Sequence, residues 1–154
     1  MFVVSAISRY LVSFRALSKR ERQVLLASFV LLPLFWVGLR VAGLQRFQTW
    51  LGRFPVRSST SIDRNEASAL GVAVNRAASR VLGPSCCLTR SLMLWWWLRR
   101  YGMSSDLRIG VRFESGELRA HAWVALGGIP INDRPDVVAQ YAAFDQPVSP
   151  DRFV

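Results

Sequence analysis

The sequence predicts an α+β fold in which helices come first and a small antiparallel sheet follows. Three observations predict it. Before Gly102, apolar residues recur at helical spacing or in continuous runs. After it, Leu107, Ile109 and Val111 alternate with polar residues and glycine, which is the period of a strand. Residues 92–98 are apolar on every side of a helix, so we expect that helix to be buried against the other elements.

The N-terminal part of the chain is expected to be helical. Residues 2–17 are compatible with an amphipathic helix. Ser18 and Glu21 have the spacing of a capping box, which predicts a second helix over about 19–32. Pro33 is expected to kink or end that helix, because proline lacks the N–H of the helical hydrogen bond.

A segment rich in Gly, Pro and Ser follows at residues 52–61 and is typical of a linker. It predicts a division of the chain into two parts. Residues 1–60 would form a basic, hydrophobic helical region with a docking or interfacial role. Residues 61–154 would form the globular domain, and the 154 residues of the whole chain suit one such domain with a small appendage.

Two further helices are predicted in the second part. The first covers about 64–82, with Ser61 or Asp63 as its N-cap and a Gly-Pro pair as its end. The second opens at residues 85–87, where two cysteines stand side by side, and runs to about Tyr101. The second helix therefore begins at a thiol and continues into the apolar run described above.

Three strands are predicted after these helices. The first covers about 107–113 and is followed by a turn at 114–117. The second covers 118–126, and a Gly127-Gly128 turn leads to a third over about 129–132. The expected result is an antiparallel meander with helices on one face.

The formal net charge of +10 is concentrated at the N-terminus. Residues 1–60 hold nine basic residues against one acidic residue, a net of +8, and residues 61–154 hold eleven against nine, a net of +2. This charge leaves an acidic peptide, an acidic protein and an anionic membrane open as partners. A nucleic acid ranks last because no nucleic-acid-binding motif is present, and we expect none to be bound.

An uncharged run over Val24–Leu39 raises the question of a membrane span. It holds sixteen residues, whereas a spanning helix needs about 20. The central Pro33 and the arginines at both ends also argue against a span. The wide spread of the preceding basic residues and the absence of a small-residue cleavage pattern argue against a signal peptide. We expect a buried helix, an interfacial helix or a docking surface instead.

The candidate chemistry rests on few residues, because the chain has one histidine and two cysteines. A cysteine at a helix N-terminus favours the thiolate, through free N–H groups and the helix dipole. His121 stands in the second strand, on the face of Trp123, and Asp133 follows the third strand. Nucleophile, base and orienting carboxylate have the logic of acyl transfer. Taken singly, a lone Cys or His is more often structural than catalytic, and no metal-ligand spacing or cofactor motif occurs.

Several motifs together resemble a known family. Cys87-Leu-Thr-Arg-Ser-Leu-Met-Leu-Trp, Ala120-His-Ala-Trp-Val and Ile131-Asn-Asp-Arg-Pro-Asp are similar to segments of the leader peptidase of lasso-peptide biosynthesis. That protein is the stand-alone catalytic half of the split B-type protein, within the transglutaminase-like superfamily. The resemblance covers about residues 65–145, and it implies a papain/transglutaminase-like core whose buried, Cys-bearing helix packs on the sheet.

The resemblance also implies roles and partners. Cys87 matches the nucleophile, His121 the general base and Asp133 the carboxylate of a cysteine protease, whereas Cys86 lies outside the motif. The implied activity is removal of the leader from a ribosomally made precursor peptide, with no cofactor. A small leader-binding recognition protein would deliver the precursor, and a macrolactam-forming cyclase would act next. A cytoplasmic protein is expected, with peripheral membrane contact left open.

The sequence leaves one alternative function open and predicts one detail of the site geometry. The chain could instead be a non-catalytic, membrane-associated or peptide-binding module that uses its basic N-terminal third. We expect His121 and Asp133 to meet as directly paired residues of two strands, which requires a three-residue loop over 126–128 or a G1 bulge, with one glycine at positive φ, in place of a two-residue turn. A two-residue glycine turn would place Asp133 opposite Ala122, on the wrong face, and Asn132 or Asp136 would become the candidate.

Overall fold

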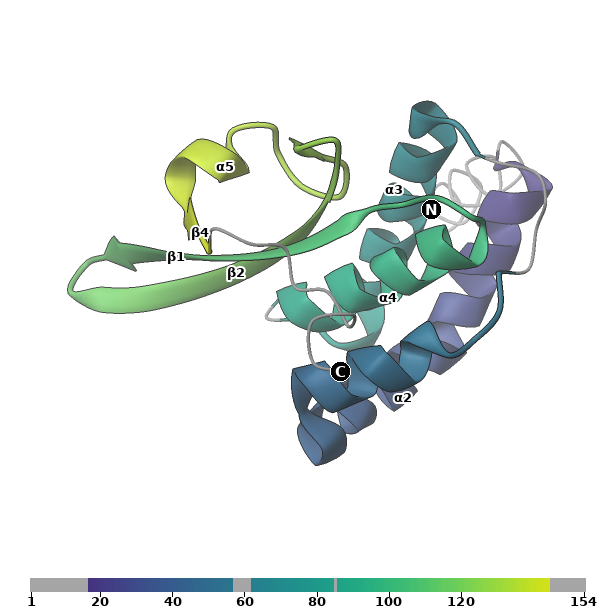
Figure 1. The fold of residues 1–154 in the computed structure, drawn as a ribbon, viewed down its shortest axis with the longest axis horizontal. Coiled ribbons are helices and arrows are strands. Elements are labelled where there is room, and N and C mark those ends of the chain that lie inside the picture. The colour runs from purple at the N-terminus through teal and green to yellow at the C-terminus, as the bar shows by residue number, and fades with distance from the viewer. Residues whose placement is uncertain (1–16, 57–61, 85, 145–154) are drawn as a thin grey trace, which may run out of the picture.

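The structure is a computed structural model that describes residues 17–56, 62–84 and 86–144. Helices precede a small antiparallel sheet, so the predicted α+β class is confirmed (Figure 1). The helix expected over 2–17 and part of the linker fall outside the described residues. The elements are α2 (Lys19–Gly52), α3 (Arg64–Val81), α4 (Cys87–Arg100), β1 (Asp106–Glu114), β2 (Glu117–Leu126), β3 (Ile129–Pro130), α5 (Val137–Gln140) and β4 (Ala142–Ala143).

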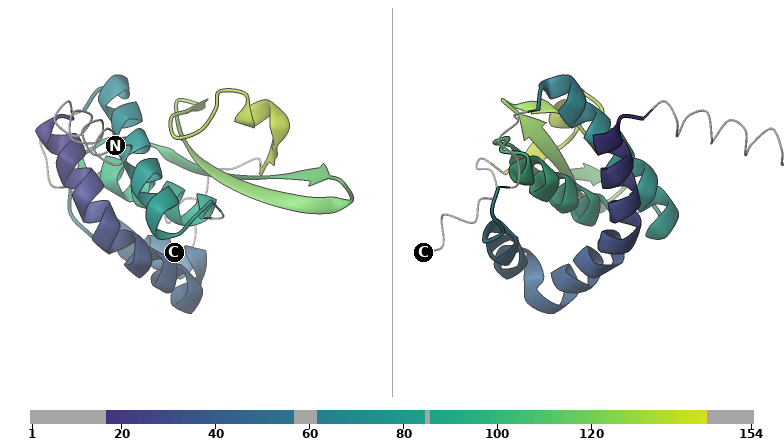
Figure 2. Two further views of the ribbon diagram at one scale, coloured as in Figure 1. Left: turned by 180° about the vertical axis from the view of Figure 1, so that it is seen from behind. Right: turned by 90° about the vertical axis from the view of Figure 1, so that its right-hand side faces the viewer.

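Helix α2 starts as predicted and is longer than predicted. Ser18 and Glu21 form the capping box, with the Glu21 N–H donating to Ser18 Oγ at 3.1 Å. The helix does not end at Pro33, so the expectation of an end there is wrong. The backbone leaves helical geometry at Gly43 (φ 73, ψ 167) instead, and α2 becomes two limbs that run in different directions (Figure 2).

The two limbs of α2 pack against each other around one glycine. A Cβ on Gly38 would lie 2.5 Å from the Phe47 ring, closer than any side chain tolerates. The ring of Phe47 also meets that of Phe35 edge to face, with centroids 5.3 Å apart. The bend at Gly43 therefore closes onto an aromatic contact, which fixes the angle between the limbs.

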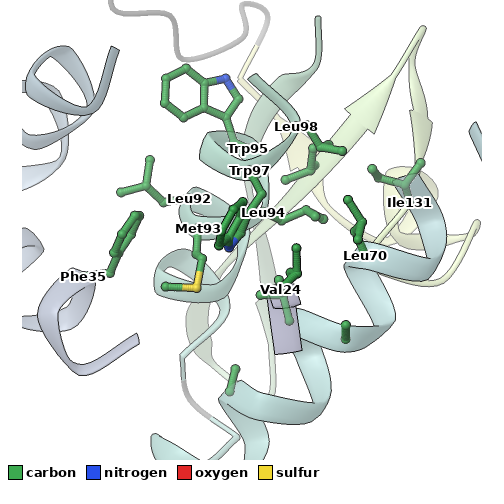
Figure 3. Packing of buried hydrophobic residues seen from close by; sticks show 14 of the residues in the cluster. Val24, Phe35, Leu70, Leu92, Met93, Leu94, Trp95, Trp97, Leu98 and Ile131 are labelled. Carbon is green, nitrogen blue, oxygen red and sulfur yellow. The ribbon is translucent and has the colours of Figure 1, made fainter. Parts of the chain in front are cut away.

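One hydrophobic core joins α2, α3 and α4 (Figure 3). Val24 and Phe35 of α2, Leu70 of α3, and Leu92 and Met93 of α4 belong to the same buried cluster. The predicted burial of the apolar helix is confirmed at residues 92–95, 97 and 98, with a half-buried side chain at 96. The inner face of α2 thus belongs to the core of the globular part, and the division at residue 60 stays a prediction.

The caps of α3 and α4 differ. The Glu66 N–H donates to Asp63 Oδ1 at 2.7 Å, which confirms Asp63 as the N-cap of α3. Cys86 occupies the N-cap position of α4 and has no capping hydrogen bond from its side chain. The first N–H groups of α4 therefore face their surroundings without a side-chain cap, and Cys87 is the first residue of the helix.

In the described part of the chain the strands form one sheet in the order β3-β2-β1-β4. Leu107, Val124 and Leu126 point to one face and join the core around α4. Trp123 and Ala125 point to the other face. Val137 of α5 packs on that face, and β4 extends the sheet beyond β1; neither of these short elements was predicted from the sequence (Figure 1).

The third strand is shorter than expected, and its turn is the one we rejected. Gly127 and Gly128 form a two-residue turn with φ of 56° and 82°. Only Ala125↔Pro130 and Leu126↔Ile129 pair, so the three-residue loop is wrong. Both glycines adopt positive φ, as a turn that follows the right-handed strand twist requires.

Candidate active site

The structure brings the three predicted residues together from three different elements. Cys87 begins α4, His121 lies in β2, and Asp133 lies in the segment that follows β3. His121 Nε2 is 2.7 Å from Asp133 Oδ2. The side chains of His121 and Asp133 are 19% and 17% exposed, so the site is half-buried and still open to a substrate.

Cys87 and His121 interact through a side-chain hydrogen bond. This bond lowers the pKa of the Cys87 thiol; burial opposes it, and backbone N–H groups of Ala122 and Leu88 reinforce it. Since Asp133 engages Nε2 of the imidazole, Nδ1 is the nitrogen left for the sulfur. The uncapped start of α4 adds free N–H groups, which also favour the thiolate.

The imidazole is biased toward its charged form. Hydrogen bonds to Asp133 and then to Cys87 raise the pKa of His121 to about 9, against the opposing effect of burial. Burial raises the pKa of Asp133, but the His121 and Arg134 hydrogen bonds and the charges of His121 and Arg90 outweigh it and lower that pKa. A thiolate–imidazolium pair beside an ionised carboxylate is the favoured state.

Asp133 reaches His121 because the ladder between β2 and β3 breaks at Asn132. The Ile131 N–H still donates to the Val124 carbonyl at 3.0 Å. The Val124 N–H then donates to the Asn132 side-chain Oδ1 at 2.8 Å, in place of a backbone carbonyl. From there the chain no longer follows the ladder, so the face on which Asp133 would have fallen in a regular strand does not apply.

Asn132 is buried. Its hydrogen bonds hold the chain in the path that leaves the ladder, which we call the detour. Its Nδ2 donates to Ser91 Oγ at 3.0 Å, and Ser91 Oγ donates to the Ala122 carbonyl at 3.0 Å. Asn75 of α3 donates to the Asn132 carbonyl at 2.7 Å. Gly71 of α3 permits the approach, since a Cβ there would lie 3.0 Å from the Ile131 carbonyl oxygen.

The short β3 also gives α4 its place beside β2. Successive residues of a strand direct their N–H and C=O groups to alternate sides. Ala122 and Val124 direct theirs to the β3 side, and β3 ends before it reaches Ala122. The Ala122 carbonyl accepts from Ser91 and its N–H bonds the Cys87 sulfur. The strand edge that β3 leaves unpaired therefore anchors the helix that begins at Cys87.

Two aromatic rings hold the imidazole in its plane. Tyr141 stacks on His121 with centroids 5.0 Å apart, and Trp123 lies 6.3 Å away at a shallow angle. Gly110, the β1 partner of His121, makes room for both rings. A Cβ there would lie 2.9 Å from Tyr141 Cβ and 3.0 Å from Trp123 Cη2.

Arg90 is a fourth charged group at the site, which the sequence analysis did not assign. Its guanidinium lies one helical turn after Cys87 and donates to Asp133 Oδ2 at 3.2 Å. The other carboxylate oxygen accepts the Arg134 N–H at 2.8 Å. Arg90 and Ser91 stand inside the Leu-Thr-Arg-Ser motif, so their position carried a signal, whereas Tyr141 had none.

Cys86 differs from Cys87 in its burial, its hydrogen-bond partner and the direction in which its pKa is shifted. Its thiol is buried and donates to the Gly83 carbonyl at 3.0 Å. Burial raises the pKa of this thiol, which keeps it protonated and inert. Among the described residues, no group of His, Cys, Asp and Glu side chains is arranged to hold a metal ion.

Comparison with known proteins gives one match. A model described as the transglutaminase-like superfamily matches residues 30–144, which is more than half of the chain and includes all three residues of the site. No curated protein and no solved structure matches the chain.

Proposed function

Because the chain belongs to the transglutaminase-like superfamily, we propose that it is a cysteine peptidase that uses Cys87, His121 and Asp133. The observation that carries the proposal is the continuous chain of interactions among them. The Cys87 thiol bonds His121, and His121 Nε2 lies 2.7 Å from Asp133 Oδ2. Nucleophile, base and orienting carboxylate are thus in their working order.

The chemistry follows from these contacts. The Cys87 thiolate attacks the scissile carbonyl, and the Cys87 backbone N–H, free at the helix start, stabilises the oxyanion. The His121 imidazolium protonates the leaving amine as the C–N bond breaks. Water then attacks the thioester, its proton passes to the imidazole, and the acid is released with regeneration of the ion pair. Asp133 keeps the imidazole oriented and stabilises its charge.

The substrate we propose is a lasso-peptide precursor, cleaved between leader and core. Support comes from the motifs around all three residues, which resemble the stand-alone leader peptidases of lasso-peptide biosynthesis. A small leader-binding protein would present the precursor, and a macrolactam-forming cyclase would consume the freed core amine.

The test is cleavage of the precursor encoded beside this protein, with and without the leader-binding protein, read by mass. We expect one cut that releases the intact core and that depends on the partner. Cys87→Ala should abolish the cut, and Cys86→Ala should retain most of it, because only Cys87 contacts the imidazole. Loss of cleavage in Cys86→Ala alone would refute the assignment of the nucleophile.

A further inference from the structure

The outer face of the first limb of α2 carries an apolar stripe that nothing in the described structure covers. We call its members the outer stripe: Leu26, Val30, Leu34, Val37 and Val41. At 100° per residue, they fall on the side of the helix opposite the buried Val24, Leu32 and Phe35. The stripe is most exposed at Val30 (67%) and Val41 (83%).

The outer stripe offers almost nothing but hydrocarbon. Between Arg22 and Arg40 the sequence has no charged residue, and its polar side chains are Gln23 and Ser28. Ser28 is buried on the inner face. A protein partner normally makes about one hydrogen bond per 100–200 Å² of interface, for which this face has few groups. Such a surface favours lipid over a protein partner.

Basic side chains stand at both ends of the outer stripe. Lys19 and Arg22 precede it, and Arg40 and Arg46 lie at or beyond its end. Arg40 stacks over the ring of Trp36 at 4.5 Å, a pair of residue types that suits the boundary between headgroups and acyl chains. The charge argues against a second copy of this chain, which would bring like charges together, and for an anionic surface.

The helix is long and apolar enough to cross a membrane, by length and composition alone. Only 28% of its most apolar window is buried, so it is not an ordinary core helix. Its inner residues nevertheless belong to the same core as α3 and α4. Crossing the bilayer would pull these side chains out of that core, whereas lying on the bilayer leaves them in place.

We propose that α2 attaches this protein to the surface of an anionic membrane. The helix lies in the interface plane, the outer stripe enters the acyl boundary, and the flanking basic residues meet lipid phosphates. The attachment is independent of the peptidase chemistry, because it uses none of the residues of the active site.

The experiment measures co-sedimentation of the full chain with vesicles of phosphatidylcholine, with and without phosphatidylglycerol. The test variant is Val30→Glu/Val41→Glu, whose two sites are exposed enough to spare the fold. The matched control is Phe113→Glu/Leu118→Glu, which makes the same charge change at two exposed apolar residues (75% and 68%) of the distant β1–β2 hairpin. Circular dichroism checks that both variants are folded.

We expect the wild type to bind the anionic vesicles about tenfold better than the neutral ones, with loss at high salt. The stripe variant should bind about tenfold less than the control variant. Alkaline carbonate should release the bound chain. The proposal is overturned if the two variants bind the vesicles equally, if wild-type binding does not depend on lipid charge, or if the bound chain resists carbonate. It is also overturned if the stripe variant loses only self-association and binds vesicles as the control does. Reactivity of Cys87 toward an alkylating agent stays the same in both variants, so failure here leaves the peptidase proposal standing.

Discussion

The two ends of β2 each join a turn of the same kind, but the ladders that these turns connect differ in length. Both turns have two residues with positive φ, at Ser115 and Gly116 (52° and 84°) and at Gly127 and Gly128 (56° and 82°). At the first end the ladder with β1 runs without a break from Glu114↔Glu117 to Asp106↔Ala125. At the second end the ladder with β3 stops after two pairs.

The difference shows what builds the active site. The uninterrupted ladder places His121 opposite Gly110 and continues from there into a hairpin whose β2 residues 117–120 are exposed (Figure 1). The interrupted ladder frees backbone groups at two residues of one β2 edge. Asn132 then bonds the Val124 N–H, and α4 bonds Ala122 through Ser91. A regular strand would have used these groups for backbone pairing, so the candidate site lies where β3 ends.

The largest effects are expected from removal of His121, the proposed base, which Asp133 reaches because the ladder with β3 is interrupted. His121→Ala should lower the cleavage rate by about 10²–10⁴-fold, the usual value of general acid–base catalysis. Asp133→Asn should cost less, because the carboxylate orients the imidazole and does not take its proton. Initial rates of precursor cleavage measure both. If both variants cleave at the wild-type rate, the triad is not the catalytic machinery.

Much of this fold was predictable because each of the longer helices and strands is signalled locally. The capping box at Ser18, the cap at Asp63 and the alternation after residue 106 all lie next to the elements that they start. The detour at Asn132 was not predictable from the glycine turn, since it depends on α3 and α4. Residue type and motif predicted the three candidate residues, which the structure brings together, whereas the register expected for His121 and Asp133 is wrong.

The second prediction concerns pH, because the coupled groups meet only at the interrupted end. His121 has its pKa raised from 6.5 to about 9, so its imidazolium stabilises the fold below 6.5 and this contribution is lost as pH rises through about 9. Cleavage should fall over the same alkaline range, as the proton for the leaving amine is lost. Asp133→Asn should move this alkaline limb to lower pH. An unchanged limb in that variant would contradict the role of Asp133.

The third prediction breaks the detour without touching the triad. Asn132→Ala orphans the buried Val124 N–H and should lower the free energy of unfolding by about 1–3 kcal/mol. It should also lower the cleavage rate, because Asp133 loses its anchor. Leu118→Ala, an exposed residue at the uninterrupted end, is the control and should change neither quantity. Denaturant unfolding and initial rates decide, and a fully active Asn132→Ala would mean that other contacts hold Asp133.

The smallest effects are expected from substitutions in the two glycine-containing turns, which test whether the turn or the detour at Asn132 positions Asp133. Gly116→Ala and Gly128→Ala place the same side chain at nearly the same positive φ, and each has open space around it. Each should lower the free energy of unfolding by about 1–2 kcal/mol, the cost of a left-handed alanine. Cleavage should survive equally in both folded variants, since Asn132 and not the turn fixes the position of Asp133. If Gly128→Ala loses far more activity than Gly116→Ala, the glycine turn sets the site after all, and the detour only follows it.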